Sequence, residues 1–196
     1  RIAKIFNQNL FFKSGEYDLS KIDNYKDLLN KFITGDIYLR KFTVIEGSTV
    51  NEVLTLIKDN EFLLGEISIK PIEGYILPET YYYKKGDKRD DLIKIMQNDL
   101  EKILDKAWQN RQKNLTIKNK EELLILASII EKETGINSER NHISGVFHRG
   151  LKIGMKLQSD PTVIYAITHG KYKLDRPLSK RDLRTKSAYN TYYKYG

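Results

Sequence analysis

The sequence contains no cysteine and no uninterrupted run of about 18 apolar residues. Without cysteine the chain can form neither a disulfide nor a thiolate metal site. Without a long apolar run it has no segment that would cross a membrane as a helix. Hydrophobic residues make up 40% of the 196 positions and charged residues make up 31%. This balance is typical of a globular protein of one or two domains and argues against a disordered chain.

Positive charge is in excess, with a formal net charge of +8 and an isoelectric point near 9.4. A basic protein can bind nucleic acid, acidic lipid or an acidic polymer. The lysines are dispersed along the chain, so the charge fits equally well a surface with no partner. Helix-turn-helix, RNA-recognition and zinc patterns are absent, so nucleic acid is not an expected partner. The three histidines match no metal motif, and neither a metal nor a cofactor is expected.

The spacing of apolar residues and of turn and capping residues predicts an α+β chain. Strands are predicted at residues 14–19 and 38–45, and helices at residues 24–32, after 48, at 88–111, at 119–134, after 138 and after 160. Thr49 with Glu52 is expected to form a capping box. Asp160 followed by Pro161 is a strong helix start, with Asp160 as the N-cap.

One stretch, Leu123–Tyr165, contains the strongest candidate for chemistry. It begins as a nearly all-apolar helix and turns abruptly to Glu131, Lys132 and Glu133. Burial disfavours the charged form of a carboxyl group, so a glutamate at the end of such a helix tends to be protonated, as a general acid must be. Alternatively, both glutamates are solvated. They lie about 200° apart around the helix, so only one can face a small cleft, and periodicity does not choose between them.

Three blocks of sequence together resemble the signature of the MltG-type (YceG-like) endolytic murein transglycosylases. The blocks are EGYILPETY at residues 73–81, ASIIEKET followed by GVF and GMKLQSDPTVIYAI at residues 127–167, and YNTY at residues 189–192. The resemblance implies a lytic transglycosylase that cleaves peptidoglycan between N-acetylmuramic acid and N-acetylglucosamine without water, leaving 1,6-anhydro ends. It also selects Glu131, which follows Ala-Ser-Ile-Ile, as general acid and then base.

The resemblance and the residue types together give the expected substrate contacts. These are Glu73, Tyr75 and Glu79 in a wall of the site, Gln158, Ser159 and Asp160 beside Glu131, and Asn190 at the substrate. Tyrosines suit the apolar faces of sugar rings. Of the four at positions 75, 81, 82 and 83, at least two are expected to be structural.

The chain departs from the family pattern at His148-Arg149-Gly150, where the family usually has an asparagine and an arginine before leucine. The departure puts any role of that pair in doubt. It leaves open a second hypothesis, a non-catalytic peptidoglycan-binding module.

Residues 1–69 are expected to form a LysM-like subdomain that is incomplete at its start, with a plain packing subdomain as the alternative. Residues 70–196 are expected to be a mainly helical catalytic domain with short strands, truncated at its C-terminal end. The resemblance implies a single membrane anchor, absent from this chain, in the bacterial inner membrane, with this domain facing the periplasm or cell wall. The implied partners are peptidoglycan glycan strands and the cell-wall synthesis machinery.

Overall fold

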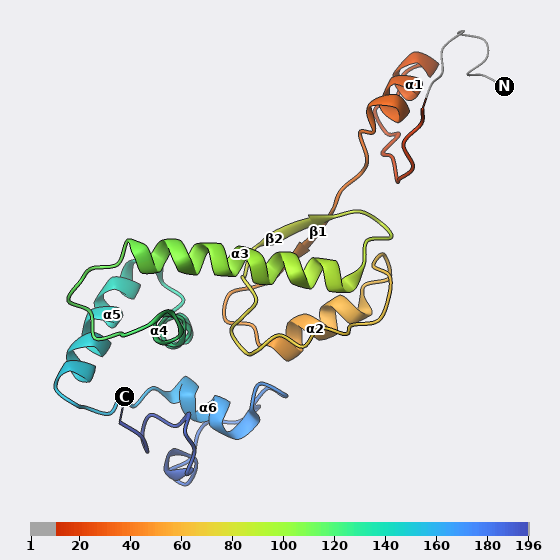
Figure 1. The fold of residues 1–196 in the computed structure, drawn as a ribbon. Helices are drawn as coiled ribbons and strands as arrows, with labels where there is room; N and C mark the ends of the chain where they lie inside the picture. The colour runs from red at the N-terminus through yellow and green to blue at the C-terminus, as the bar shows by residue number, and fades with distance from the viewer. Residues whose placement is uncertain (1–10, 196) are drawn as a thin grey trace.

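The computed structural model describes residues 11–195, which form six α-helices, one two-stranded sheet and a 3-10 helix (Figure 1). In chain order the elements are α1 (Tyr25–Thr34), β1 (Arg40–Thr43), α2 (Val50–Asp59), β2 (Thr80–Tyr83), α3 (Arg89–Gln109), α4 (Lys120–Glu133), α5 (Asn137–Lys152), α6 (Asp160–Thr168) and η2 (Asp182–Arg184). The chain therefore has the predicted α+β class, and most of its regular structure is helical.

The two strands pair antiparallel, with Arg40 opposite Tyr83 and Thr43 opposite Thr80. Alternate side chains of a strand point to opposite faces, so one face of this short sheet is buried under α2 and α3. Eleven buried residues form one core there: Phe42, Val44, Val53, Ile57, Leu63, Ile76, Tyr81, Tyr83, Leu92, Ile93 and Met96. Burial of these side chains is the main force that stabilises this part of the chain.

This core crosses the predicted domain boundary between residues 69 and 70. β1 lies before that point and β2 after it, and the two strands are hydrogen-bonded to each other. The packing is therefore continuous across the boundary. The division into 1–69 and 70–196, and the LysM-like nature of the first part, stay predictions.

The capping box predicted at the start of α2 is confirmed. The Thr49 hydroxyl accepts a hydrogen bond from the Glu52 N–H at 3.2 Å, and the Glu52 carboxylate accepts one from the Thr49 N–H at 2.7 Å. These two bonds satisfy N–H groups that the helix itself cannot pair.

The other helical part is organised around α4, which contacts α3, α5 and α6. Figure 1 shows α4 nearly end-on, with α5 on one side and α6 below it. A second and smaller core joins Ile117, Leu126 and Phe147. Because α4 contacts three helices, the orientation of its side chains depends on all of them.

The N-terminal segment differs from the prediction in one respect. Residues 14–19 were expected to form a strand, but they form none. Only one backbone bond reaches this segment from the region of β1, from the Tyr38 N–H to the Glu16 carbonyl at 2.8 Å, and a ladder needs several. The Glu16 carboxylate also pairs with Arg40 at 2.8 Å, which fastens the segment to the start of β1.

Candidate active site

Glu131 lies two residues before the end of α4, and its side chain is 25% exposed. Its surroundings differ from those expected, because an arginine and not an apolar wall lies against the carboxylate. Arg140 Nη2 is 2.9 Å from Oε1 and 2.8 Å from Oε2. The sequence prediction therefore placed the glutamate correctly on its helix and missed its ionic partner.

The turn between α4 and α5 explains why Arg140 meets Glu131. The Thr134 N–H still bonds to the Ile130 carbonyl at 3.2 Å, so the chain leaves α4 without a gap. The Thr134 hydroxyl then accepts from the Ile136 N–H at 3.0 Å and donates to the Glu139 carboxylate at 2.7 Å. This tight connection brings the first turn of α5 back to the last turn of α4.

Glu133 occupies a different face of α4 and has a different partner. Its carboxylate accepts a hydrogen bond from the Ser159 hydroxyl at 2.7 Å. The Gln158–Asp160 loop was expected beside Glu131, but its buried serine is bonded to Glu133. Side chains two positions apart on a helix point about 200° away from each other. A loop that contacts Glu133 therefore lies on the side of α4 that Glu131 does not face.

The start of α6 also differs from the prediction. Ser159 is the N-cap residue and Asp160 is already the first helical residue, so the helix begins one position earlier than expected. The physical reason is that Asp160 has another partner: its carboxylate accepts from the Tyr192 hydroxyl at 2.7 Å. This bond, together with burial, raises the pKa of Tyr192 to about 12.

Residues 191 and 192 hold the Gln158–Asp160 loop from the side of the tail. The Gln158 N–H bonds to the Thr191 carbonyl at 3.3 Å, and the Ser159 N–H bonds to the Thr191 hydroxyl at 2.9 Å. Gln158 itself is exposed and adopts a left-handed backbone conformation with φ of 53°. Non-glycine residues rarely adopt this conformation, and such residues cluster at functional sites.

Asn190 is fully buried, with an exposed fraction of 0%. Its amide nitrogen donates to the Leu183 carbonyl at 3.0 Å and to the Thr185 carbonyl at 2.8 Å, and its amide oxygen accepts from the Tyr192 N–H at 2.9 Å. In this arrangement the side chain holds the tail in place. The direct substrate contact predicted for it stays a prediction.

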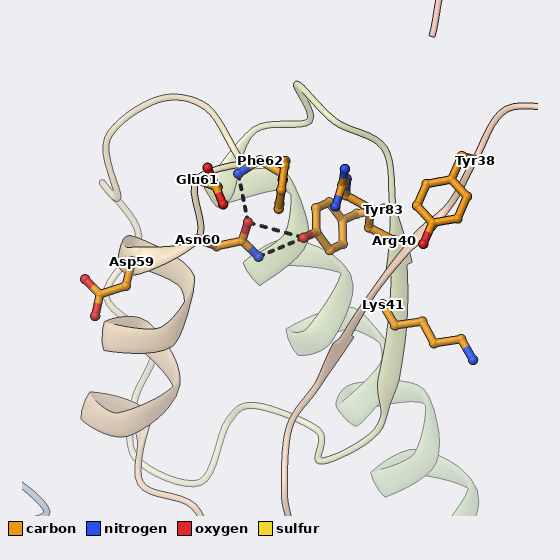
Figure 2. A pocket seen from close by; sticks show the side chains of 8 residues that line it. All are labelled: Tyr38, Arg40, Lys41, Asp59, Asn60, Glu61, Phe62 and Tyr83. Atoms are coloured by element: carbon orange, nitrogen blue, oxygen red, sulfur yellow. Dashed lines mark hydrogen bonds between the residues drawn. The ribbon is translucent and has the colours of Figure 1, made fainter. Parts of the chain in front are cut away.

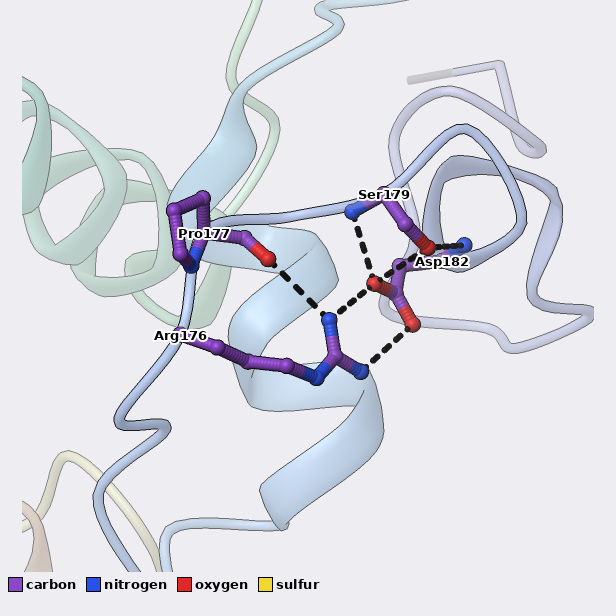
Figure 3. A network of polar contacts seen from close by, with 4 residues as sticks. All are labelled: Arg176, Pro177, Ser179 and Asp182. Carbon is purple, nitrogen blue, oxygen red and sulfur yellow. Dashed lines mark hydrogen bonds and ion pairs between the residues drawn. The ribbon is translucent and has the colours of Figure 1, made fainter.

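A polar clasp in the tail supports η2, which precedes Asn190 (Figure 3). Arg176 donates to both oxygens of Asp182, at 2.6 and 3.1 Å, and the Ser179 N–H and hydroxyl donate to the same carboxylate at 2.8 and 2.7 Å. These contacts, chiefly the one with Arg176, hold the pKa of Asp182 far below its usual range.

The predicted wall at residues 73–83 lies against other parts of α4 and α2. The Glu73 carboxylate accepts from the Val50 N–H, the first residue of α2, at 2.9 Å. Gly74 has φ of 84°, and a β-carbon there would lie 3.7 Å from Leu124 of α4. The wall therefore packs about two helical turns before Glu131 along α4. Glu73 itself is engaged in anchoring α2.

The tyrosines of the wall divide as expected. Tyr81 and Tyr83 are buried in the core of the sheet, which confirms that at least two of the four are structural. Tyr82 is exposed and Tyr75 is half-buried. Glu79 is exposed, and its carboxylate accepts a hydrogen bond from the next backbone N–H, that of Thr80, at 2.8 Å.

A separate pocket of about 410 Å³ opens between the start of β1, the end of β2 and the turn after α2 (Figure 2). Its lining residues are Tyr38, Arg40, Lys41, Asp59, Asn60, Glu61, Phe62 and Tyr83. Arg40 lies over the Phe62 ring, 3.4 Å from its centroid, and Asn60 bonds to the Tyr83 hydroxyl at 2.8 Å. The residues predicted for catalysis and substrate binding do not line this pocket.

Over the part of the chain that the structure describes, no group of three or more His, Asp or Glu side chains is arranged to hold a metal ion. Within residues 11–195, the helices are also too short or too polar to cross a membrane.

At the departure from the family pattern, His148 Nδ1 lies 2.7 Å from the Thr116 hydroxyl, which ties α5 to the segment before α4. Burial lowers the pKa of His148.

Sequence reasoning missed Arg140, Thr191 and Tyr192 as parts of the site. Arg140 stands nine positions after Glu131, across a turn whose geometry the sequence alone does not define. Thr191 and Tyr192 belong to the YNTY block, so the motif itself was a usable signal. Only its asparagine was selected.

Comparison with known proteins assigns the chain to a family. The YceG-like family matches residues 1–196. The endolytic murein transglycosylase of Bacillus subtilis is 32% identical over 94% of this chain, and that of Streptococcus pneumoniae strain D39 is 28% identical over 94%. The chain spans 59% and 41% of the lengths of these two relatives.

A solved structure supports the fold. The crystal structure of a yceG-like protein from Listeria monocytogenes matches all of this chain and 73% of its own, at 27% identity and with a TM-score of 0.57. The chain therefore belongs to the YceG-like family.

Proposed function

We propose that this chain is the catalytic part of an endolytic peptidoglycan lytic transglycosylase. The observation that carries the proposal is the family match across residues 1–196. The relatives from Bacillus and Streptococcus that bear this activity in their names support it. The proposed reaction cleaves the bond between N-acetylmuramic acid and N-acetylglucosamine without water and leaves a 1,6-anhydro end.

Glu131 is the proposed proton-transfer residue. A hydrolysing glycosidase normally places two carboxylates on either side of the scissile bond. Here the neighbouring carboxylate, Glu133, leaves α4 on another side and is bonded to Ser159. This divergence supports a mechanism with one carboxylate, and a lytic transglycosylase requires only one.

The proposed reaction uses that carboxyl group twice. Protonated Glu131 first gives its proton to the glycosidic oxygen as the bond from that oxygen to C1 of muramic acid breaks. The resulting carboxylate then takes the proton of the muramic C6 hydroxyl, whose oxygen bonds to C1 and closes the anhydro ring. The proton balance closes, and Glu131 ends protonated. Such proton transfer contributes about 10²–10⁴-fold to a rate, so the remainder must come from orientation of the sugar.

The proposed glycan contacts are the accessible members of the predicted set. Tyr75, Glu79 and Gln158 are at least partly exposed, so a sugar can reach them, and Glu79 is held by the neighbouring Thr80 N–H. On the face of α4 that carries Glu131, Ala127 and Ser128 are exposed small residues that leave room for a polymer. Glu73 and Ser159 are already bonded within the protein, and their proposed role is to hold the contacting residues in place.

The proposed location is the cell-wall side of the bacterial cytoplasmic membrane, where the glycan strands are. A membrane anchor outside this chain and a contact with the cell-wall synthesis machinery remain part of the proposal. Fractionation of cells that express the full-length protein tests the location. Recovery of that protein in the soluble fraction would contradict it.

A matched pair of variants tests the assignment of the acid. Glu131→Gln keeps the size and the Arg140 contact but cannot exchange the proton, so release of fragments from purified sacculi should fall at least about 100-fold. Glu133→Gln makes the same change two residues away and should retain measurable turnover. Full turnover in Glu131→Gln, with loss in Glu133→Gln, would transfer the role to Glu133. Binding of sacculi by the unmodified protein without any fragment release would instead support the non-catalytic module.

A further inference from the structure

Arg140 is the charged side chain that the structure places directly against the proposed acid. Among residues 11–195, no other cationic group lies within ion-pair distance of the Glu131 carboxylate. A single guanidinium nitrogen, Nη2, makes both contacts, at 2.9 and 2.8 Å. The arginine side chain is 38% exposed, so its outer edge can be reached from solvent.

The contact leaves the guanidinium incompletely paired. Arg140 Nε is buried, and it is the one buried side-chain nitrogen or oxygen without a hydrogen-bond partner among the described residues. An arginine binds a carboxylate most strongly through two parallel N–H groups, and here only one nitrogen is used. Buried polar groups are rarely left unpaired, and such a group calls for a functional or structural explanation. The resting contact is therefore one that a better-placed acceptor could replace.

The proposed reaction gives a reason for such a replacement. Glu131 must give a proton to the glycosidic oxygen when the bond breaks, whereas in the resting structure both of its oxygens are paired with the Arg140 guanidinium. If Arg140 stayed in place, it would oppose the first half of the reaction and assist the second. The contact must loosen before bond cleavage and can form again afterwards.

Resting on the proposed function, we propose that Arg140 changes partner when substrate binds, leaving Glu131 for a carboxylate of the peptide attached to muramic acid. The guanidinium turns outward and binds that carboxylate through Nε and a terminal nitrogen, and Glu131 takes up a proton from solvent. Arg140 is then a positioning residue. It makes cleavage depend on the peptide, and it selects peptide-bearing strands over peptide-free ones.

The turn between α4 and α5 fits this role. The bonds of Thr134 to Ile136 and Glu139 fix the backbone on both sides of the ion pair, so Arg140 can change rotamer while its own helix stays in place. The net charge of +8 favours approach of a substrate that carries carboxylates.

The test compares two substrates of equal glycan length, one bearing its peptides and one stripped of them by an amidase. With the unmodified protein, kcat/KM should be about tenfold higher on the peptide-bearing strands. In Arg140→Gln the kcat/KM values on the two substrates should agree within about twofold. If Arg140 had only a structural role, its replacement would lower kcat/KM on both substrates by the same factor.

Arg140→Lys provides the matched control, because it keeps the charge but cannot form two parallel N–H contacts. It should keep part of the preference, and it replaces Arg140→Gln if thermal melting shows that the glutamine variant is unfolded. Equal cleavage of both substrates by the unmodified protein, or an unchanged preference in either variant, would overturn the proposal. Cleavage of neither substrate by the unmodified protein would instead refute the proposed function.

Discussion

Residues 40–96 and residues 134–192 are stabilised in different ways. The first region has one continuous core of eleven buried residues, all of them apolar or aromatic. The second contains every buried polar residue of the described chain: Thr134, Ser159, Thr162, Thr168 and Asn190. Apolar burial is strong but not directional, whereas hydrogen bonds fix positions and orientations. The first region therefore supplies stability, and the second supplies the geometry of the site.

The largest effect is expected in the apolar region. Ile57→Ala removes a fully buried side chain, so the free energy of unfolding should fall by about 2–5 kcal/mol. Turnover per folded molecule should change little, because Ile57 contributes only to the core of the sheet. Urea denaturation measures the free energy of unfolding. Ile95→Ala, at a side chain that is 46% exposed, is the matched control and should cost less than about 0.5 kcal/mol.

A smaller loss of stability, but a larger loss of function, is expected in the polar region. Asn190→Ala removes both donors to the Leu183 and Thr185 carbonyls, and the free energy of unfolding should fall by about 2–3 kcal/mol. Because the next two residues hold Ser159 and Asp160, turnover per folded molecule should fall as well. The same change at Asn110, an exposed residue, is the control. Wild-type turnover in a stably folded Asn190→Ala would remove the distinction between the regions.

The contact of Glu73 with the start of α2, inside the apolar region, should contribute less. Glu73 bonds to the first N–H of α2, at the positive end of the helix dipole, and Glu73→Gln keeps the acceptor but removes the charge. The expected cost is about 0.3–1 kcal/mol, read from the urea midpoint at low salt. High salt should reduce the difference. A cost of several kcal/mol would show that Glu73 does more than anchor α2.

The smallest effect on stability is expected from the loss of the Asp182 charge, either at low pH or by substitution. The pKa of Asp182 is lower in the folded chain than in the unfolded one, so its contribution to stability is present above the unfolded pKa, near 4. That contribution is lost as the pH falls from about 4 toward the folded value. Asp182→Asn should therefore lower the melting temperature at pH 7 and flatten its dependence on pH below 4. Identical pH profiles for the variant and the unmodified chain would show that the contacts of Asp182 do not stabilise the fold.

The sequence was sufficient for the elements whose signals are local. The capping box of Thr49 and Glu52 and the periodicity of residues 88–111 predicted α2 and α3, because caps and apolar faces depend on residues three or four positions apart. The residues 14–19 alternate like a strand, yet they lack a partner with a matching ladder. Local pattern alone did not reveal that missing partner.

The site was less predictable, because its contacts join residues far apart in the chain. The position of Glu131 on its helix followed from the motif, but the pairing of Ser159 with Glu133 joins residues 26 positions apart. Asp160 looked like a helix cap because its bond to Tyr192, 32 positions away, has no signature in the sequence. Tertiary packing decided each of these contacts.

The chemistry of the new end on the released glycan tests the central claim most directly. Mass spectrometry of fragments from purified sacculi should find 1,6-anhydro-muramic ends, which are lighter than reducing ends by one water. The Glu131→Gln variant should produce none of these ends. Reducing ends from the unmodified protein would show that water attacks the bond, and they would contradict a mechanism in which Glu131 alone transfers the proton.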